Sequence, residues 1–201
     1  MSGVAIIDYG VGNLRSVEKA FQAGGVEAVV SSDEEVLRAA DKLVLPGVGA
    51  FRACMEALAE RGFDRLVRER VEEGTPLLGV CVGMQMLFEE SEEFGTTRGL
   101  GFLRGRVRRF PEGLRVPQVG WNQVAWAGPH SLAEGIEGGT FFYFVHSFYC
   151  EAADAATAIG QTEYGLTYAS VVSGGNVCGV QFHPEKSQAA GLRLLKNFAE
   201  G

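Results

Sequence analysis

Residues 75–90, TPLLGVCVGMQMLFEE, decide the fold class and contain the first candidate site. The apolar run at 76–80 has the length of a buried strand, and apolar side chains then recur at helical spacing, at Met84, Leu87 and Phe88. Cys81 lies between the two segments in Gly-Val-Cys-Val-Gly, a thiol version of the G-x-S-x-G elbow that exposes a nucleophile on a sharp strand-to-helix turn. Flanking glycines tolerate strained backbone, and a helix N-terminus stabilises a thiolate. A buried structural cysteine is the alternative for this motif alone.

The rest of the first half alternates apolar runs with amphipathic stretches. The pattern predicts strands at 4–8, 26–30, 42–45 and 76–80, and helices from 14 to 23, 33 to 39, 51 to 60 and 63 to 72. Ser32 is the expected N-cap of the second helix. Buried strands separated by helices require crossover connections, so a parallel sheet is expected.

The pattern changes after Gly95. Short strands with glycine-rich turns are predicted at 103–110, 123–126, 141–145, 155–162, 166–172 and 176–182, followed by a helix at 189–199. Such hairpins add antiparallel strands to the parallel sheet. The predicted fold is one α/β domain, residues 1–201, with an open, mostly parallel twisted sheet flanked by helices and extended by antiparallel strands.

Composition narrows the class of function. Hydrophobic residues make up 46% of the 201 residues and charged residues 21%, which is typical of a globular protein. A net charge of −7 without a dense basic tract argues against nucleic-acid binding, and no apolar stretch has the length of a membrane span. Four scattered cysteines without a C-x-x-C pair predict free thiols in a reducing cytoplasm and no metal site. No P-loop or dinucleotide-binding fingerprint indicates a cofactor.

Residues 179–187, GVQFHPEKS, form the second candidate site. An apolar strand delivers His183 at its C-terminal end, the sheet edge at which the cysteine also emerges. Imidazole can hold a thiol as thiolate and later protonate a leaving group, and Glu185 can fix its tautomer. A solvated surface turn would explain His-Pro-Glu by itself, but its combination with Cys81 favours catalysis.

Residues 46–49, Pro-Gly-Val-Gly, form the third candidate site. Acyl transfer needs N–H donors aimed at the developing oxyanion. The amide of Val82, directly after the cysteine, is one candidate, and the amide of Gly49 is the other. An ordinary strand-to-helix turn is the alternative.

Other histidines and charged residues are expected to be structural. His146 has no acid beside it in the sequence and is interpreted as a packed or interface histidine, and His130 as part of a solvated turn. Arg104, Arg106 and Arg108 alternate and so share one solvated strand face.

Together, GVCVGMQ, PGVG and GVQFHPEKS closely resemble the triad, or class I, glutamine amidotransferases. More narrowly, the chain resembles the glutaminase subunits of imidazole glycerol phosphate synthases in histidine biosynthesis. The narrower resemblance rests on motifs in family order along nearly the whole chain: DYGVGNLRSV (8–17), LPGVGAF (45–51), VGWN (119–122), FVHSFY (144–149) and HPEKS (183–187). The family has His-Met before Gly-Trp-Asn, where this chain has Gln118-Val119.

The resemblance implies a role for each matching position. Cys81 would form a glutamyl thioester, His183 would act as base and acid, and Glu185 would orient it. Gly49 and Val82 would supply the oxyanion amides, and Gln85, Ser147 and the backbone near Phe148 would hold the amino-acid end of glutamine. Ammonia would pass to a (β/α)₈-barrel synthase (cyclase) subunit in a heterodimer, contacted by Asn13, Trp121, Asn122, Tyr143 and Lys186.

Three other functional assignments are alternatives to this one. The glutaminase of pyridoxal phosphate synthase has a similar length and triad but would not explain DYGVGN, VGWN and VHSFY. A flavodoxin-like cysteine hydrolase or redox sensor would not need His-Pro-Glu near the C-terminus. A non-catalytic homologue would normally lack a triad member.

Overall fold

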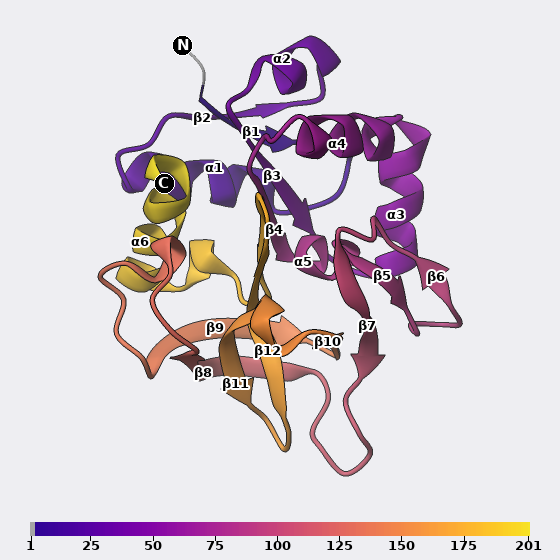
Figure 1. The fold of residues 1–201 in the computed structure, drawn as a ribbon, viewed down its shortest axis with the longest axis vertical. Helices are drawn as coiled ribbons and strands as arrows, with labels where there is room; N and C mark the ends of the chain where they lie inside the picture. The colour runs from indigo at the N-terminus through magenta and orange to yellow at the C-terminus, as the bar shows by residue number, and fades with distance from the viewer. Residues whose placement is uncertain (1–2) are drawn as a thin grey trace.

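The computed structural model describes residues 3–201 (Figure 1). Its first half alternates strands and helices, as the sequence pattern predicts. The elements are β1 (Val4–Ile7), α1 (Leu14–Ala23), β2 (Ala28–Ser31), α2 (Glu34–Ala39), β3 (Lys42–Gly47), α3 (Phe51–Glu60), α4 (Phe63–Glu72) and β4 (Leu77–Cys81).

These strands form a parallel sheet in the order β2-β1-β3-β4, and β13 (Val177–Val180) adds to β4 in parallel. Helices α1 and α6 (Gln188–Glu200) lie on one side of the sheet, and α3 and α4 lie on the other (Figure 1). Both faces are therefore covered, and β1 and β4 are buried along their whole length.

The second half extends this sheet with mostly antiparallel strands, coloured from magenta to orange at the lower end of Figure 1. Strand β12 (Thr167–Gly174) pairs with β13, β10 (Phe148–Ala152) pairs with β12, and β7 (Leu103–Arg109) pairs with β10, each pair antiparallel. Strand β11 (Ala158–Glu163) links β12 to the long hairpin of β8 (Gln118–Trp126) and β9 (Thr140–His146). The predicted α/β fold with antiparallel additions is confirmed.

Two local predictions are wrong. The helix after Cys81, α5 (Val82–Met86), has only five residues, and Phe88 opens strand β5 (Phe88–Ser91), which pairs with β7 and β6 (Thr97–Arg98). Pairing with distant strands overrides the local helical spacing. Helix α2 is capped by Asp33, not Ser32, because its carboxylate accepts a hydrogen bond from the Glu35 amide at 2.9 Å.

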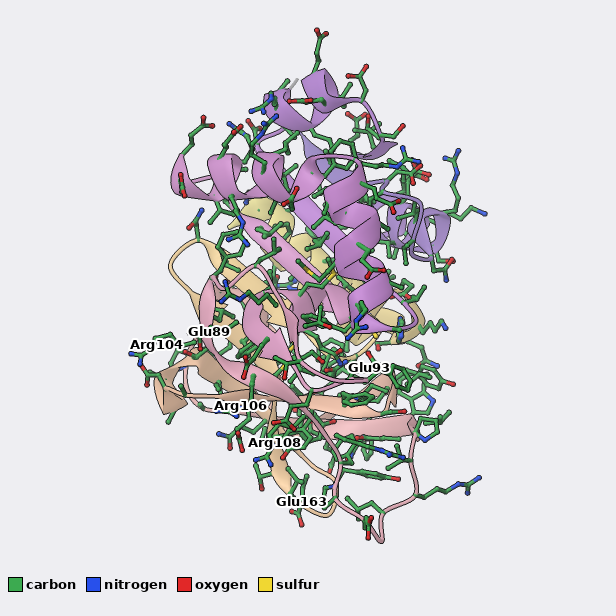
Figure 2. The ribbon with its side chains drawn as sticks, turned by 90° about the vertical axis from the view of Figure 1, so that its right-hand side faces the viewer. Glu89, Glu93, Arg104, Arg106, Arg108 and Glu163 are labelled. Atoms are coloured by element: carbon green, nitrogen blue, oxygen red, sulfur yellow. The ribbon has the colours of Figure 1, made fainter. Side chains whose placement is uncertain are left out.

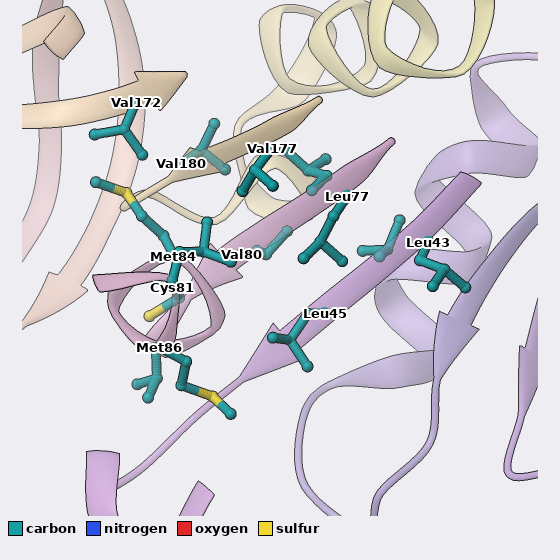
Figure 3. Close-up of a cluster of buried hydrophobic side chains, with 14 of the residues drawn as sticks. Leu43, Leu45, Leu77, Val80, Cys81, Met84, Met86, Val172, Val177 and Val180 are labelled. Carbon is teal, nitrogen blue, oxygen red and sulfur yellow. The ribbon is translucent and has the colours of Figure 1, made fainter. Parts of the chain in front are cut away.

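Part of the apolar core is formed by side chains of β3, β4 and β13 (Figure 3). Leucine and valine side chains from all three strands are buried, among them Leu43, Leu45, Leu77, Val80, Val177 and Val180. Figure 3 shows Cys81 where β4 ends, with Met84 of α5 extending towards Val172. The candidate nucleophile is thus placed on the rim of a packed core.

The arginines of β7 form a solvated face, as expected. Arg104, Arg106 and Arg108 are exposed and lie along one strand in Figure 2. Arg108 pairs with Glu151 on β10 at 3.1 Å, and Arg106 approaches Glu92 at 3.8 Å. Exposed pairs of this kind contribute little to stability.

Candidate active site

Cys81 occupies a strained turn between β4 and α5. Its backbone has φ 56° and ψ −114°, a conformation that costs a side-chain-bearing residue about 1–3 kcal/mol. Close backbone packing holds the turn in place. A Cβ on Gly83 would overlap the carbonyl oxygen of Leu45, and a Cβ on Gly47 would lie 2.6 Å from the Gly83 nitrogen. The glycines of GVCVG and PGVG therefore serve to bring these two turns together.

His183 emerges beside this turn because β13 and β4 are parallel neighbours. Val180 pairs with Val80, so both chains leave the sheet at the same edge. His183 Nδ1 lies 2.9 Å from Glu185 Oε1, and their side chains are only 8% and 1% exposed. The carboxylate accepts from Nδ1 and leaves Nε2 for other partners.

The surroundings of His183 favour its charged form. Burial alone would lower the pKa of His183, but hydrogen bonds and charge interactions with Cys81 and Glu185 outweigh burial and raise this pKa to about 10. Cys81 and Glu185 thus act on the same imidazole. At neutral pH the ring is an imidazolium next to the sulfur, and such a neighbour stabilises a thiolate.

Most of the predicted site residues line one cavity of about 400 Å³, which is large enough for an amino acid. Cys81 and His183 both line this cavity. The oxyanion candidates Gly49 and Val82 line it too, as do the glutamine-binding candidates Gln85, Ser147 and Phe148 and the interface candidate Lys186. Glu185 lies behind His183. Residues from four separate parts of the chain thus meet at one place.

The Gln85 amide is held from two sides. Its Nε2 donates to the Phe148 carbonyl at 3.1 Å and to Gln181 Oε1 at 3.0 Å. Gln181 in turn directs its own Nε2 at Cys81 Sγ, 3.9 Å away. Both N–H groups of Gln85 are therefore occupied, and its carbonyl oxygen is left as an acceptor.

Two polar residues at the site, Glu93 in the cavity wall and Gln181 beside Cys81, were not predicted as site residues. Glu93 follows β5 and accepts a hydrogen bond from the Phe51 amide at 2.7 Å. It lies in the acidic run EESEE, in which nothing local distinguishes one carboxylate from the others. Gln181 belongs to GVQFHPEKS, but only the packing of β13 beside α5 brings it to the cysteine.

His146 is a packed histidine, as predicted. Its Nδ1 lies 2.8 Å from the Phe148 carbonyl and its Nε2 3.2 Å from the Tyr168 hydroxyl. Burial, reinforced by the charge of His183, lowers the pKa of His146 to about 4, although the bond to Phe148 opposes the shift. His130, by contrast, is not in a solvated turn, because its Nδ1 accepts from the Leu132 amide and its Nε2 lies 3.2 Å from Ser173 Oγ.

Gln118 and Val119, which stand where the family has His-Met, differ in their exposure to solvent. Gln118 is buried and its side chain is hydrogen-bonded to the Tyr168 hydroxyl at 3.0 Å. Val119 is 59% exposed. Only the second residue of this pair is therefore accessible to a partner.

Three of the predicted interface residues form one cluster. The rings of Trp121 and Tyr143 meet edge to face at 5.8 Å, and Lys186 Nζ lies 5.9 Å from the centre of the Tyr143 ring. Asn13 is exposed at the start of α1, next to Gly12, which packs on Pro46.

Asn122 is not brought to this cluster. Side chains alternate along β8, and Asn122 shares the inner face with buried Val124. Its Nδ2 donates to the Glu163 carbonyl at 2.9 Å (Glu163 is labelled in Figure 2). Its predicted contact with a partner stays a prediction.

Residues 3–201 contain no group of three or more His, Cys, Asp or Glu side chains arranged to hold a metal ion. Within the same residues, every helix is too short or too polar to cross a membrane.

This chain was compared with known protein families and solved structures, and the matches agree with the cysteine and the His–Glu pair that meet at one cavity. The family model for class-I glutamine amidotransferases matches residues 5–200. The chain therefore belongs to the class-I glutamine amidotransferase family. A solved structure described as a glutamine amidotransferase aligns with a TM-score of 0.78 at 25% identity, covering 99% of this chain and 98% of that one. PurLQS from Thermotoga maritima shares the fold, with a TM-score of 0.77 at 18% identity over 98% of each chain.

Curated relatives define the family more narrowly. Imidazole glycerol phosphate synthase subunit HisH of Methylococcus capsulatus is 52% identical over 209 residues, covering 98% of this chain and 96% of that protein. The HisH subunit of Moorella thermoacetica is 50% identical over 200 residues, covering 100% and 95%. Within its family the chain is therefore one of the HisH subunits, the glutaminase subunits of imidazole glycerol phosphate synthase in histidine biosynthesis. The predicted family and function are confirmed.

Proposed function

We propose that Cys81, His183 and Glu185 hydrolyse glutamine to glutamate and ammonia, and that the ammonia passes directly to a (β/α)₈-barrel synthase subunit. One observation carries this proposal: Cys81 and His183 line the same cavity, and Glu185 Oε1 lies 2.9 Å from His183 Nδ1, on the side of the ring away from the cavity. The pyridoxal phosphate, redox-sensor and non-catalytic alternatives find no support in relatives about 50% identical over nearly the full chain.

The reaction follows from these positions. Cys81 Sγ, its proton transferred to His183, attacks the side-chain amide carbon of glutamine. The amides of Gly49 and Val82 stabilise the oxyanion, and the His183 imidazolium protonates the departing nitrogen, which leaves as ammonia. His183 then takes a proton from water, which attacks the thioester and releases glutamate and the Cys81 thiol.

The cavity wall suits the amino-acid end of glutamine. The unoccupied Gln85 carbonyl oxygen and the Glu93 carboxylate can both accept from the α-ammonium group. The backbone at Ser147 and Phe148 can receive the α-carboxylate on the other side. Glu93 and Gln85 are therefore assigned to substrate binding together with the two backbone positions.

A surface next to the cavity suits a protein partner. Val119, Trp121 and Phe141 are 59%, 46% and 52% exposed on the hairpin of β8 and β9, and Trp121 adjoins Tyr143 and Lys186. Exposed aromatic side chains around a cavity are typical of interface anchors. Lys186 lines both the cavity and this surface, so a partner docked here would sit over the source of ammonia.

Direct transfer has a chemical reason. Ammonia in water at neutral pH is mostly ammonium, which is not a nucleophile, so a sheltered route preserves its reactivity. In the proposed heterodimer, the barrel subunit uses it to make imidazole glycerol phosphate and aminoimidazole carboxamide ribotide.

We also assign residues 1–201 to one domain, since one buried cluster extends from Val4 to Phe198. We place this domain in the cytoplasm, where its four free cysteines stay reduced.

Glutamate release from glutamine tests this proposal. It would be measured for the purified chain alone, and with the barrel synthase and its ribonucleotide substrate. We expect strong stimulation in the complex, abolished by Cys81→Ala, while Cys81→Ala still supports synthesis from added ammonium salt. Loss of the ammonium-driven reaction as well, or no hydrolysis in either mixture, would contradict the proposed division of labour.

A further inference from the structure

The turn at 46–49 is held from its buried side by two side chains that do not line the cavity. The Tyr9 hydroxyl donates to the Pro46 carbonyl at 2.6 Å. The Cys54 thiol donates to the Val48 carbonyl at 3.3 Å. The first and third residues of this turn, Pro46 and Val48, thus have their carbonyl groups anchored from the buried side.

Both anchoring groups are buried and neutral. Tyr9, two residues after β1, is 2% exposed, and Cys54 on α3 is 0% exposed. Burial raises the pKa of Tyr9, and the neighbouring Cys54 raises it further. Burial also raises the pKa of Cys54, although hydrogen bonds to Tyr9 and the Val48 carbonyl oppose this shift. Each group therefore keeps the proton that it donates.

Anchoring the Val48 carbonyl orients the next amide. A peptide unit is planar and trans, so its C=O and N–H point in opposite directions. With the Val48 carbonyl turned towards buried Cys54, the Gly49 N–H points away from it. Gly49 lines the cavity at φ +83°, and within residues 3–201 its N–H has no hydrogen-bond acceptor. A free amide that faces a catalytic cavity is what an oxyanion hole requires.

We propose that Tyr9 and Cys54 are positioning residues that keep the Val48–Gly49 peptide turned with its N–H towards the substrate. This inference rests on the proposed hydrolysis of glutamine and adds two residues to that machinery, neither of which touches the substrate. If this peptide rotated by half a turn, the Val48 carbonyl would face the developing oxyanion and repel it. The thiol biases the turn against that orientation.

Four variants test the proposal in the complex with the barrel synthase. Cys54→Val removes the S–H donor and retains the volume, Cys54→Ser restores a donor, and Tyr9→Phe removes only the hydroxyl. Cys178→Val is the matched control, since this thiol contacts Ser173 and lies outside the cavity. The measurements are kcat and KM for glutamine hydrolysis, with ammonium-driven synthesis as a check on the partner.

Removing an oxyanion donor costs about 100- to 1,000-fold in kcat, so loosening its orientation should cost less. We expect Cys54→Val and Tyr9→Phe each to lower kcat about fivefold to tenfold with KM unchanged. Cys54→Ser and Cys178→Val should stay within about twofold of the unaltered chain.

An unchanged kcat in both Cys54→Val and Tyr9→Phe would overturn the proposal, as would a Cys54→Ser variant as slow as Cys54→Val. If Cys54→Val does not fold, Tyr9→Phe, which creates only a small cavity, decides the question. Failure of the unaltered complex to hydrolyse glutamine would instead contradict the proposed function.

Discussion

Two buried histidines line the same cavity with opposite charge preferences. His183 faces a carboxylate and a thiol, which raise its pKa to about 10, whereas burial lowers the pKa of His146 to about 4 even though its ring contacts the Phe148 carbonyl. Near neutral pH only His183 carries a proton that it can give to a leaving group. Burial lowers the pKa of both histidines, and only His183 has partners whose hydrogen bonds and charges outweigh burial.

A comparison of Glu185→Gln with His183→Ala tests the proposed division of roles. General acid–base catalysis contributes about 10²- to 10⁴-fold, so His183→Ala should lose that much in kcat and Glu185→Gln less. The Glu185 carboxylate raises the pKa of His183, so its removal should let the imidazolium deprotonate at lower pH. The fall of kcat on the alkaline side should therefore move towards neutral pH.

The measurement is kcat for glutamine hydrolysis in the complex between pH 6 and pH 10. An alkaline limb that stays in place in Glu185→Gln, or a loss as large as in His183→Ala, would count against Glu185 as the group that orients the histidine.

At the scale of elements, the site depends on the contact of β3 with the turn between β4 and α5. The backbone of Leu45 approaches Gly83 too closely for a side chain, and Gly47 approaches Gly83 in the same way. This contact holds Cys81 beside the turn at 46–49, which the five-residue helix α5 could not do by itself.

Gly83→Ala should therefore destabilise the protein by about 3 kcal/mol, at the upper end of the usual cost of overpacking. Gly138→Ala is the matched control, because a Cβ there meets no atom within 4 Å. Urea unfolding of both variants measures the effect. A Gly83→Ala variant as stable as Gly138→Ala would show that the contact is not constrained in this way.

For the whole molecule, the two halves of the sheet have different tasks. The parallel half provides Cys81, His183 and the oxyanion turn at its edge, and the β8–β9 hairpin of the antiparallel half provides the exposed aromatic surface beside the cavity. Figure 1 places these strands at the end of the molecule away from β1 and β2. A partner that docks on this hairpin is thus directed to the cavity.

Trp121→Ala should weaken the binding of the barrel synthase by about 30-fold, the loss typical of a central aromatic anchor. Val29→Ala on β2 is the control, because Val29 is also exposed (47%) but lies on the edge strand at the other side of the sheet. Titration of one subunit against the other measures the affinity. Equal affinities for the two variants would place the interface elsewhere.

Sequence reasoning predicted the site well where a motif and a strand end coincide. Cys81 lies in the seven-residue motif GVCVGMQ, and His183 and Glu185 lie in the nine-residue motif GVQFHPEKS. Neighbouring parallel strands bring the two motifs together. It missed Glu93, because five adjacent polar residues give no local sign of which carboxylate turns inward. It also predicted a longer helix after Cys81, because helical spacing at Leu87 and Phe88 cannot reveal pairing with a strand fifteen residues away.

By itself, the sequence determined the alternation of strands and helices and the family, and it predicted the nucleophile, the base and the carboxylate that orients the base. These depend on local periodicity and on short motifs whose geometry is set by covalent backbone constraints. Only the tertiary structure decided which side chains complete the cavity, that Asn122 turns inward while Trp121 stays exposed, and that Tyr9 and Cys54 lie beneath the oxyanion turn. Those relations join residues far apart in the chain, and close packing of the whole core, rather than any local pattern, brings them into contact.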